Sequence, residues 1–145
     1  MPTDHANGSI VVAAPAPDVL AVLRDVESQP EWVPQITAAE LLEEYEDGTP
    51  ATAVFELSTP VGDDRFTLEF EHAADAMSWT LVKSSMQRRQ DGVYRVRDRG
   101  DGSTEVSLEL TIEHSLSAPG FLRRKVFGGF VNGALAGLRT HLTPG

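Results

Sequence analysis

Between Ile36 and Ile112 the sequence alternates apolar and polar residues with a period of two, and no other feature constrains the fold as strongly. Successive side chains of a β-strand point to opposite faces of a sheet, so the pattern predicts strands with one apolar and one polar face. Short turns such as Ala74-Asp75 and Asp91-Gly92 connect them, which makes the sheet antiparallel. The predicted strands are 36–46, 51–59, 65–72, 77–82, 92–97 and 104–114.

The alternation also assigns the two faces of the sheet. Trp79 and Tyr94 belong to the apolar set, whereas Glu69, Glu109 and Arg95 belong to the polar set. A register slip of one residue would exchange the faces and bury a row of charges. We therefore expect the two aromatic residues on the inner face of the sheet and the three charged residues in solvent.

Predicted helices flank this strand region on both sides. A strand at 9–14 precedes a short helix that begins at Pro17, and a proline-bracketed turn at 29–34 surrounds Trp32. Residues 119–142 have the spacing of a long amphipathic helix. The sequence therefore predicts an α+β fold in which this helix covers the apolar face of a single curved antiparallel sheet. The apolar stripe of the helix comprises Val126, Phe127, Phe130, Val131, Ala134, Leu135, Leu138 and Leu142.

Three glycines recur every four residues in the long helix, at positions 129, 133 and 137. Each costs about 1 kcal/mol of helix stability relative to alanine. Such a row permits close backbone approach to the sheet or to a second subunit, or leaves free volume for a ligand. The sequence alone leaves these three interpretations open.

Length and composition limit the classes of protein to which the chain can belong. Its 145 residues suit one domain, at 9–143, preceded by a disordered segment at 1–8. The formal net charge of −10 argues against nucleic acid and anionic membrane surfaces as partners. No cysteine is present, so disulfides and cysteine zinc sites are excluded. We find no signal peptide and no membrane-spanning stretch, and expect a cytoplasmic protein without integral membrane contact.

Six segments of the chain carry a resemblance to a known family: Ile10–Pro15, Val19–Asp25, Pro30–Pro34, Ser78–Leu81, Gly92–Val96 and Pro119–Arg124. In this order they resemble START-like domains, also called the SRPBCC superfamily, and especially actinobacterial members of the polyketide cyclase/dehydrase type. The resemblance runs from about Ser9 to Leu142 and implies the helix-grip fold, with a seven-stranded sheet curved around the C-terminal helix and two short helices after the first strand. Residues 9–143 would then form one START-like domain.

The resemblance also implies an apolar cavity between sheet and helix. Binding or transport of a hydrophobic small molecule, such as a lipid, isoprenoid or polyketide, is the first function we expect. A cofactor-independent polyketide aromatase/cyclase or dehydrase is the alternative, and a ligand-free interaction protein is the third. We expect the protein to be a monomer or a homodimer. No cofactor and no metal are expected. The candidate ligand-binding residues are Trp32, Phe55, Phe66, Phe70, Trp79, Tyr94, Leu108, Phe127, Phe130 and Ala134.

Three residues are weak candidates for catalysis. His72 and His114 continue the inward parity of their strands to the strand ends, where imidazole could act as acid or base at the cavity mouth. Tyr94 could polarise a carbonyl group. The strand arginines have outward parity, and Arg88 and Arg89 are predicted in a loop at 83–91, so no arginine is expected inside the cavity.

Overall fold

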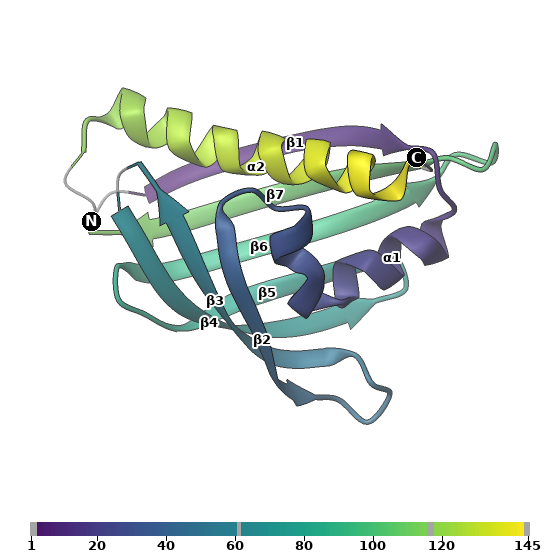
Figure 1. Cartoon of the computed structure of the whole chain (residues 1–145), viewed down its shortest axis with the longest axis horizontal. Coiled ribbons are helices and arrows are strands. Elements are labelled where there is room, and N and C mark those ends of the chain that lie inside the picture. The colour runs from purple at the N-terminus through teal and green to yellow at the C-terminus, as the bar shows by residue number, and fades with distance from the viewer. Residues whose placement is uncertain (1–2, 61, 116–117, 144–145) are drawn as a thin grey trace.

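Seven antiparallel strands form one sheet in the order β1-β7-β6-β5-β4-β3-β2 (Figure 1). The computed structural model describes residues 3–60, 62–115 and 118–143. Two short helices follow the first strand and one long helix follows the last, as the resemblance implies. The elements are β1 (Thr3–Val12), α1 (Ala16–Arg24), the 3-10 helix η1 (Val26–Glu31), β2 (Ile36–Glu44), β3 (Pro50–Thr59), β4 (Gly62–Ala73), β5 (Ala76–Ser84), β6 (Gln87–Asp98), β7 (Thr104–His114) and α2 (Gly120–Leu142).

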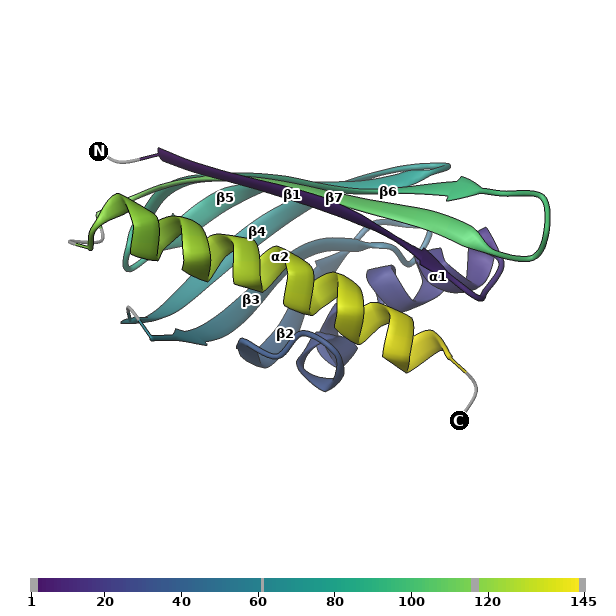
Figure 2. The ribbon, with the colours of Figure 1, turned by 90° about the horizontal axis from the view of Figure 1, so that it is seen from above.

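Helix α2 lies across the concave face of the sheet (Figure 2). On one side it packs against β1, where a Cβ added at Gly8 would lie 3.1 Å from the Leu135 side chain. On the other side it meets the segment between η1 and β2, because Gly137 lies directly against the carbonyl oxygen of Trp32. The helix thus closes the space between the two edges of the curved sheet. The close approach to this segment explains why position 137 requires a glycine, whereas a Cβ at Gly129 would meet no neighbouring atom.

The predicted faces of the sheet are confirmed. Trp79 and Tyr94 are buried, at 8% and 4% exposure. Glu69, Glu109 and Arg95 are exposed, and Arg95 pairs with Glu109 on the outer face at 2.9 Å. The apolar stripe of α2 is confirmed too, with Phe130 and Leu142 partly buried and the other members buried. Strand alternation and helix periodicity therefore define one continuous core.

The expectation of a disordered segment at 1–8 is wrong for residues 3–8. These residues form the first part of β1 and pair with β7 from Thr3↔Glu113 to Gly8↔Leu108. Their inward positions hold Asp4, Ala6 and Gly8, so no apolar alternation marks the strand. Residues 1 and 2 lie outside the described part of the chain.

The predicted loop at 83–91 and turn at Asp91-Gly92 are also wrong. Strand β5 continues to Ser84 and β6 begins at Gln87, so Arg88 and Arg89 lie on a strand and are exposed. Gly92 lies opposite Trp79 in the β5–β6 ladder, and a Cβ at Gly92 would overlap the indole ring. The glycine therefore accommodates an aromatic side chain from the neighbouring strand.

A buried cluster of Asp4, His114 and Arg123 ties together the ends of three elements. The Asp4 carboxylate accepts hydrogen bonds from His114 Nε2 at 2.6 Å and from Arg123 Nε at 3.1 Å. The side chains of Asp4 and His114 are 6% and 1% exposed, and that of Arg123 is 20% exposed. Buried charges of this kind require a partner, so the cluster fastens β1 to β7 and to the first turn of α2.

We expect Gly137→Ala and Gly129→Ala to change stability in opposite directions. An alanine at 137 collides with backbone at Trp32 and should cost about 1–3 kcal/mol, more than its gain in helix propensity. An alanine at 129 meets nothing and should stabilise the protein by about 0.5–1 kcal/mol. Urea unfolding of both variants measures this difference; equal shifts would show that α2 does not approach Trp32 closely.

Removal of the Asp4 carboxylate should destabilise the fold strongly. Asp4→Ala leaves His114 and Arg123 without their shared partner in a buried place, at a cost of about 3 kcal/mol. Asp63→Ala, at an exposed position of β4, is the matched control and should change the free energy of unfolding by less than about 0.5 kcal/mol. If both variants unfold like the wild type, β1 does not depend on this cluster.

Candidate ligand-binding site

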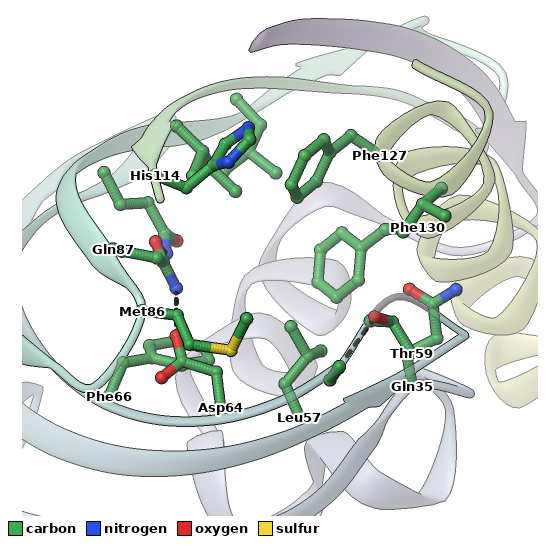
Figure 3. Close-up of a pocket in the computed structure, with 15 residues that line it drawn as sticks. Gln35, Leu57, Thr59, Asp64, Phe66, Met86, Gln87, His114, Phe127 and Phe130 are labelled. Carbon is green, nitrogen blue, oxygen red and sulfur yellow. Dashed lines mark hydrogen bonds between the residues drawn. The ribbon is translucent and has the colours of Figure 1, made fainter. Parts of the chain in front are cut away.

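Two small pockets lie between the sheet and α2. The first, the terminal pocket, lies where β3, β6 and β7 end or begin near the start of α2 (Figure 3). The second, the central pocket, is lined by residues of η1, of the segment that follows it, of strands β2 to β6 and of α2. The terminal pocket is lined by Gln35, Leu57, Thr59, Gly62, Asp64, Phe66, Met86, Gln87, Gln90, Leu110, Ile112, His114, Val126, Phe127 and Phe130.

The central pocket has an almost entirely apolar and aromatic wall. Its aromatic rings contact one another directly: the ring centroids of Phe55 and Phe66 are 5.6 Å apart, and those of Trp79 and Tyr94 are 5.4 Å apart. These contacts fill most of the space that a curved sheet and one helix enclose. The lining residues are Gln29, Val33, Ile36, Phe55, Phe66, Leu68, Phe70, Trp79, Gln90, Tyr94 and Phe130.

The two pockets are separated by few side chains. Phe66, Gln90 and Phe130 line both of them. The terminal and central pockets have volumes of about 40 and 30 Å³, measured over the positions that the centre of a water molecule can take. That space holds a few water molecules in each. Phe130 is the only one of the three on α2, and it is only partly buried.

A chain of hydrogen bonds connects the polar side chains along the sheet side of both pockets. Trp79 Nε1 donates to Gln90 Oε1 at 2.8 Å, Gln90 Nε2 donates to Gln87 Oε1 at 2.7 Å, and Gln87 Nε2 donates to Asp64 Oδ2 at 2.8 Å. Asp64 also accepts hydrogen bonds from the hydroxyl groups of Ser84 and Ser85. Each of these buried polar groups therefore has a protein partner, as burial requires.

Gln35 differs from the other pocket amides because its Oε1 is buried without a hydrogen-bond partner. The residue lies between η1 and β2, and its backbone carbonyl is fixed by the Ser58 amide at 2.9 Å. In Figure 3 its carboxamide lies beside Phe130 at the lower right of the terminal pocket. A buried polar atom of this kind is expected to pair with something in the pocket.

Two titratable side chains contribute to the pocket walls in different ways. His114 lines the terminal pocket, packs on Phe127 with ring centroids 5.3 Å apart, and is oriented by Asp4 from behind. Burial raises the pKa of Tyr94 in the central pocket, so its phenol stays neutral at physiological pH and cannot act as a base. No lysine or arginine is found among the described residues that line either pocket.

The structure brings most of the predicted site residues to the pockets, but it separates the two histidines. Of the predicted ligand-binding residues, Trp32, Leu108 and Ala134 line neither pocket and are buried in the core. His72 lies at the opposite end of β4 from Asp64, with Nε2 hydrogen-bonded to the Pro50 carbonyl at 2.8 Å. The predicted residues that do line a pocket are Phe55, Phe66, Phe70, Trp79, Tyr94, His114, Phe127 and Phe130.

Sequence reasoning missed the polar residues of the pockets. Asp64 has the inward parity of Phe66 and Phe70, so extending the predicted strand 65–72 backwards by one residue would have found it. Gln90 has the parity of Tyr94 but was assigned to a loop. Gln87 follows no simple parity, because a register shift separates it from Arg89 in the pairing with β7. Gln35 lies outside every strand and carries no periodic signal.

Within residues 3–60, 62–115 and 118–143, no group of three or more histidine, aspartate and glutamate side chains is arranged to hold a metal ion. None of the helices in this part of the chain has the length and apolar character needed to span a membrane.

Solved structures with the same fold include proteins of different function. A START superfamily protein from Mycobacterium smegmatis is 22% identical with a TM-score of 0.86, over 95% of this chain and 96% of that one. The Zhui aromatase/cyclase from Streptomyces sp. R1128 is 16% identical with a TM-score of 0.79, over 97% and 94%. A STAR-related lipid transfer protein from Xanthomonas axonopodis is 22% identical with a TM-score of 0.75, over 94% and 84%.

These likenesses establish the fold, and the sequence itself establishes the family. No functionally curated protein matches the chain. The sequence pattern of a family described as polyketide cyclase/dehydrase and lipid transport matches residues 3–143, nearly the whole chain. The match includes all of β1, whose first half lacks the apolar alternation of a strand, and the full length of α2. The chain belongs to the polyketide cyclase/dehydrase and lipid-transport family.

Proposed function

We propose that this protein binds and carries a hydrophobic small molecule, of lipid, isoprenoid or polyketide type, between the sheet and α2. One observation carries the proposal: two apolar-walled pockets lie end to end in the core and share Phe66, Gln90 and Phe130 as their partition. Concave apolar sites with few polar groups are typical of small-molecule binding sites. Family membership supports the same class of ligand.

The energetics favour an apolar ligand, provided that the partition moves. Burial of apolar surface contributes about 25 cal/mol per Å², before the costs of association. Neither pocket alone holds more than a few water molecules, so a larger ligand must occupy both. Phe130 is the partition residue best placed to move, because it is partly buried and lies on the helix, whereas Phe66 is 5% exposed within the sheet. We propose that rotation of Phe130 joins the pockets.

Catalysis of a cyclisation or dehydration is the second candidate, and His114 is the observation that favours it. Cyclisation of a polyketide requires a base near an acidic carbon and donors for the enolate oxygen. His114 faces the terminal pocket with Asp4 behind it, an arrangement that orients an imidazole. For the enolate oxygen, the described residues that line the two pockets include no lysine or arginine side chain. His72 lines neither pocket and is hydrogen-bonded to the Pro50 carbonyl. We therefore favour binding without turnover.

We expect tryptophan emission to report ligand binding. In a Trp32→Phe variant, Trp79 is the sole tryptophan, and it lines the central pocket whereas Trp32 lines neither pocket. Titration with a flat polycyclic aromatic such as 1-aminoanthracene should quench Trp79 emission with a Kd in the micromolar range. The His114→Ala exchange in this background should leave much of that affinity, since the apolar walls supply it.

Two outcomes would contradict this account. Absence of saturable quenching by any apolar probe would favour an interaction protein that uses the fold without a ligand. Turnover of a polyketide thioester mimic by the wild type, lost in His114→Ala and in Tyr94→Phe, would instead show an enzyme.

Truncation of the partition should strengthen the binding of larger ligands. Phe130→Ala joins the two pockets and should raise the affinity for a three- or four-ring aromatic about tenfold, equivalent to ~1.4 kcal/mol. The same change should cost up to about 3 kcal/mol of folding stability. Phe121→Ala is the matched control, because Phe121 lies on the same helix and is 69% exposed. Weaker binding by Phe130→Ala than by Phe121→Ala would show that Phe130 is a contact residue and not a barrier.

A further inference from the structure

The buried Oε1 atom of Gln35, a residue that is itself only partly buried, indicates which polar group the ligand carries. This oxygen has no hydrogen-bond partner, and leaving a buried polar group unpaired costs about 1–3 kcal/mol. As an acceptor, Oε1 needs a donor from the ligand. A hydroxyl group supplies one through its O–H, whereas an ether oxygen and an ionised carboxylate cannot.

The amides of Gln87 and Gln90 in the pocket walls make no such demand. Gln90 and Gln87 are joined to each other at 2.7 Å, Gln90 accepts from Trp79, and Gln87 donates to Asp64. This chain of partners is complete from the central pocket to the terminal pocket. Gln35, across the terminal pocket from Gln87 in Figure 3, is therefore the side chain that a ligand can satisfy.

The charges around the terminal pocket disfavour an anionic ligand. Its wall includes the Asp64 carboxylate and, among the described lining residues, no lysine or arginine. The nearby guanidinium of Arg123 is held by Asp4 and by the Ala118 carbonyl and does not line the pocket. A carboxylate or phosphate brought into this pocket would lose its hydration without a lysine or arginine to balance its charge. The imidazole of His114 in the same wall is already hydrogen-bonded through Nε2 to the Asp4 carboxylate.

The remaining wall orients the ligand. Leu57, Leu110 and Ile112 surround the terminal pocket, and the partition residue Phe130 leads to the aromatic wall of the central pocket. A polar group at Gln35 therefore leaves the rest of the ligand in apolar surroundings on both sides of the partition. The fitting molecule has one polar end and a long or flat apolar body.

We propose that the ligand is an apolar alcohol or phenol whose hydroxyl group pairs with Gln35 in the terminal pocket, and that the site rejects the corresponding carboxylate. This inference rests on the proposed binding function and specifies its ligand class. Gln35 is the residue that determines the specificity, and Asp64 supplies the repulsion against acids.

The test compares ligands that share one chain but differ in the polar end. At pH 8, where the acid is ionised, 1-decanol, decyl methyl ether and decanoate are titrated into the Trp32→Phe protein, with Trp79 emission as the readout. The alcohol should bind about tenfold more tightly than the ether, which offers no donor, and at least tenfold more tightly than the acid. In Gln35→Leu the preference for alcohol over ether should vanish.

Controls separate the role of Gln35 from general effects on the fold. Thr37→Val, at an exposed position of β2 outside both pockets, should keep the wild-type order of affinities. Gln35→Met serves as a second variant if Gln35→Leu does not fold. The comparison of the three ligands on unaltered Gln35 requires neither variant.

Each outcome has a distinct meaning. Decanoate binding as tightly as decanol would overturn this inference and leave the proposed function standing. A preference for alcohol that persists in Gln35→Leu would overturn the assignment to Gln35. Failure of all three ligands and of the aromatic probe to bind would overturn the proposed function, and this inference with it.

Discussion

The close packing of α2 against both sides of the curved sheet is the constraint on which the rest of the structure depends. On the β1 side, Gly8 allows Val131 and Leu135 to approach the strand, and on the other side Gly137 contacts the backbone of Trp32. Because the helix is held at both edges, it cannot sink further into the concave face. Space therefore remains under the helix toward its first half, where Phe127 and Phe130 meet the sheet.

This residual space explains why the interior contains pockets and polar side chains. A core filled by apolar residues alone would leave no reason to bury Asp64 and Gln90 or to place the partly buried Gln87 between them. Their hydrogen bonds to one another and to Trp79 offset the cost of removing them from water and fix one arrangement of the wall. The aromatic side chains around them pack on one another and leave two small pockets between the sheet and the helix.

The architecture could be predicted from the sequence because one face of most strands between residues 36 and 112 is largely apolar. Phe66, Trp79 and Leu110 follow their neighbours at intervals of two, and any shift would bury charge. Strand β1 could not be predicted in full, since Asp4 becomes a core residue only through His114, 110 positions away. The Asp91-Gly92 pair was interpreted as a turn because the true reason for the glycine, the Trp79 ring on the neighbouring strand, is not visible in the local sequence. The size of the pockets was likewise beyond prediction, since it depends on how the aromatic rings pack together.

A crystal structure of the protein with 1-decanol tests the central claim that sheet and helix enclose one ligand site behind a movable partition. The account predicts continuous density from Gln35 to Trp79, with the hydroxyl oxygen within hydrogen-bond distance of the Gln35 amide and the Phe130 ring rotated from its position here. Density for the ligand elsewhere on the molecule, with the terminal and central pockets unchanged and Phe130 still between them, would contradict it.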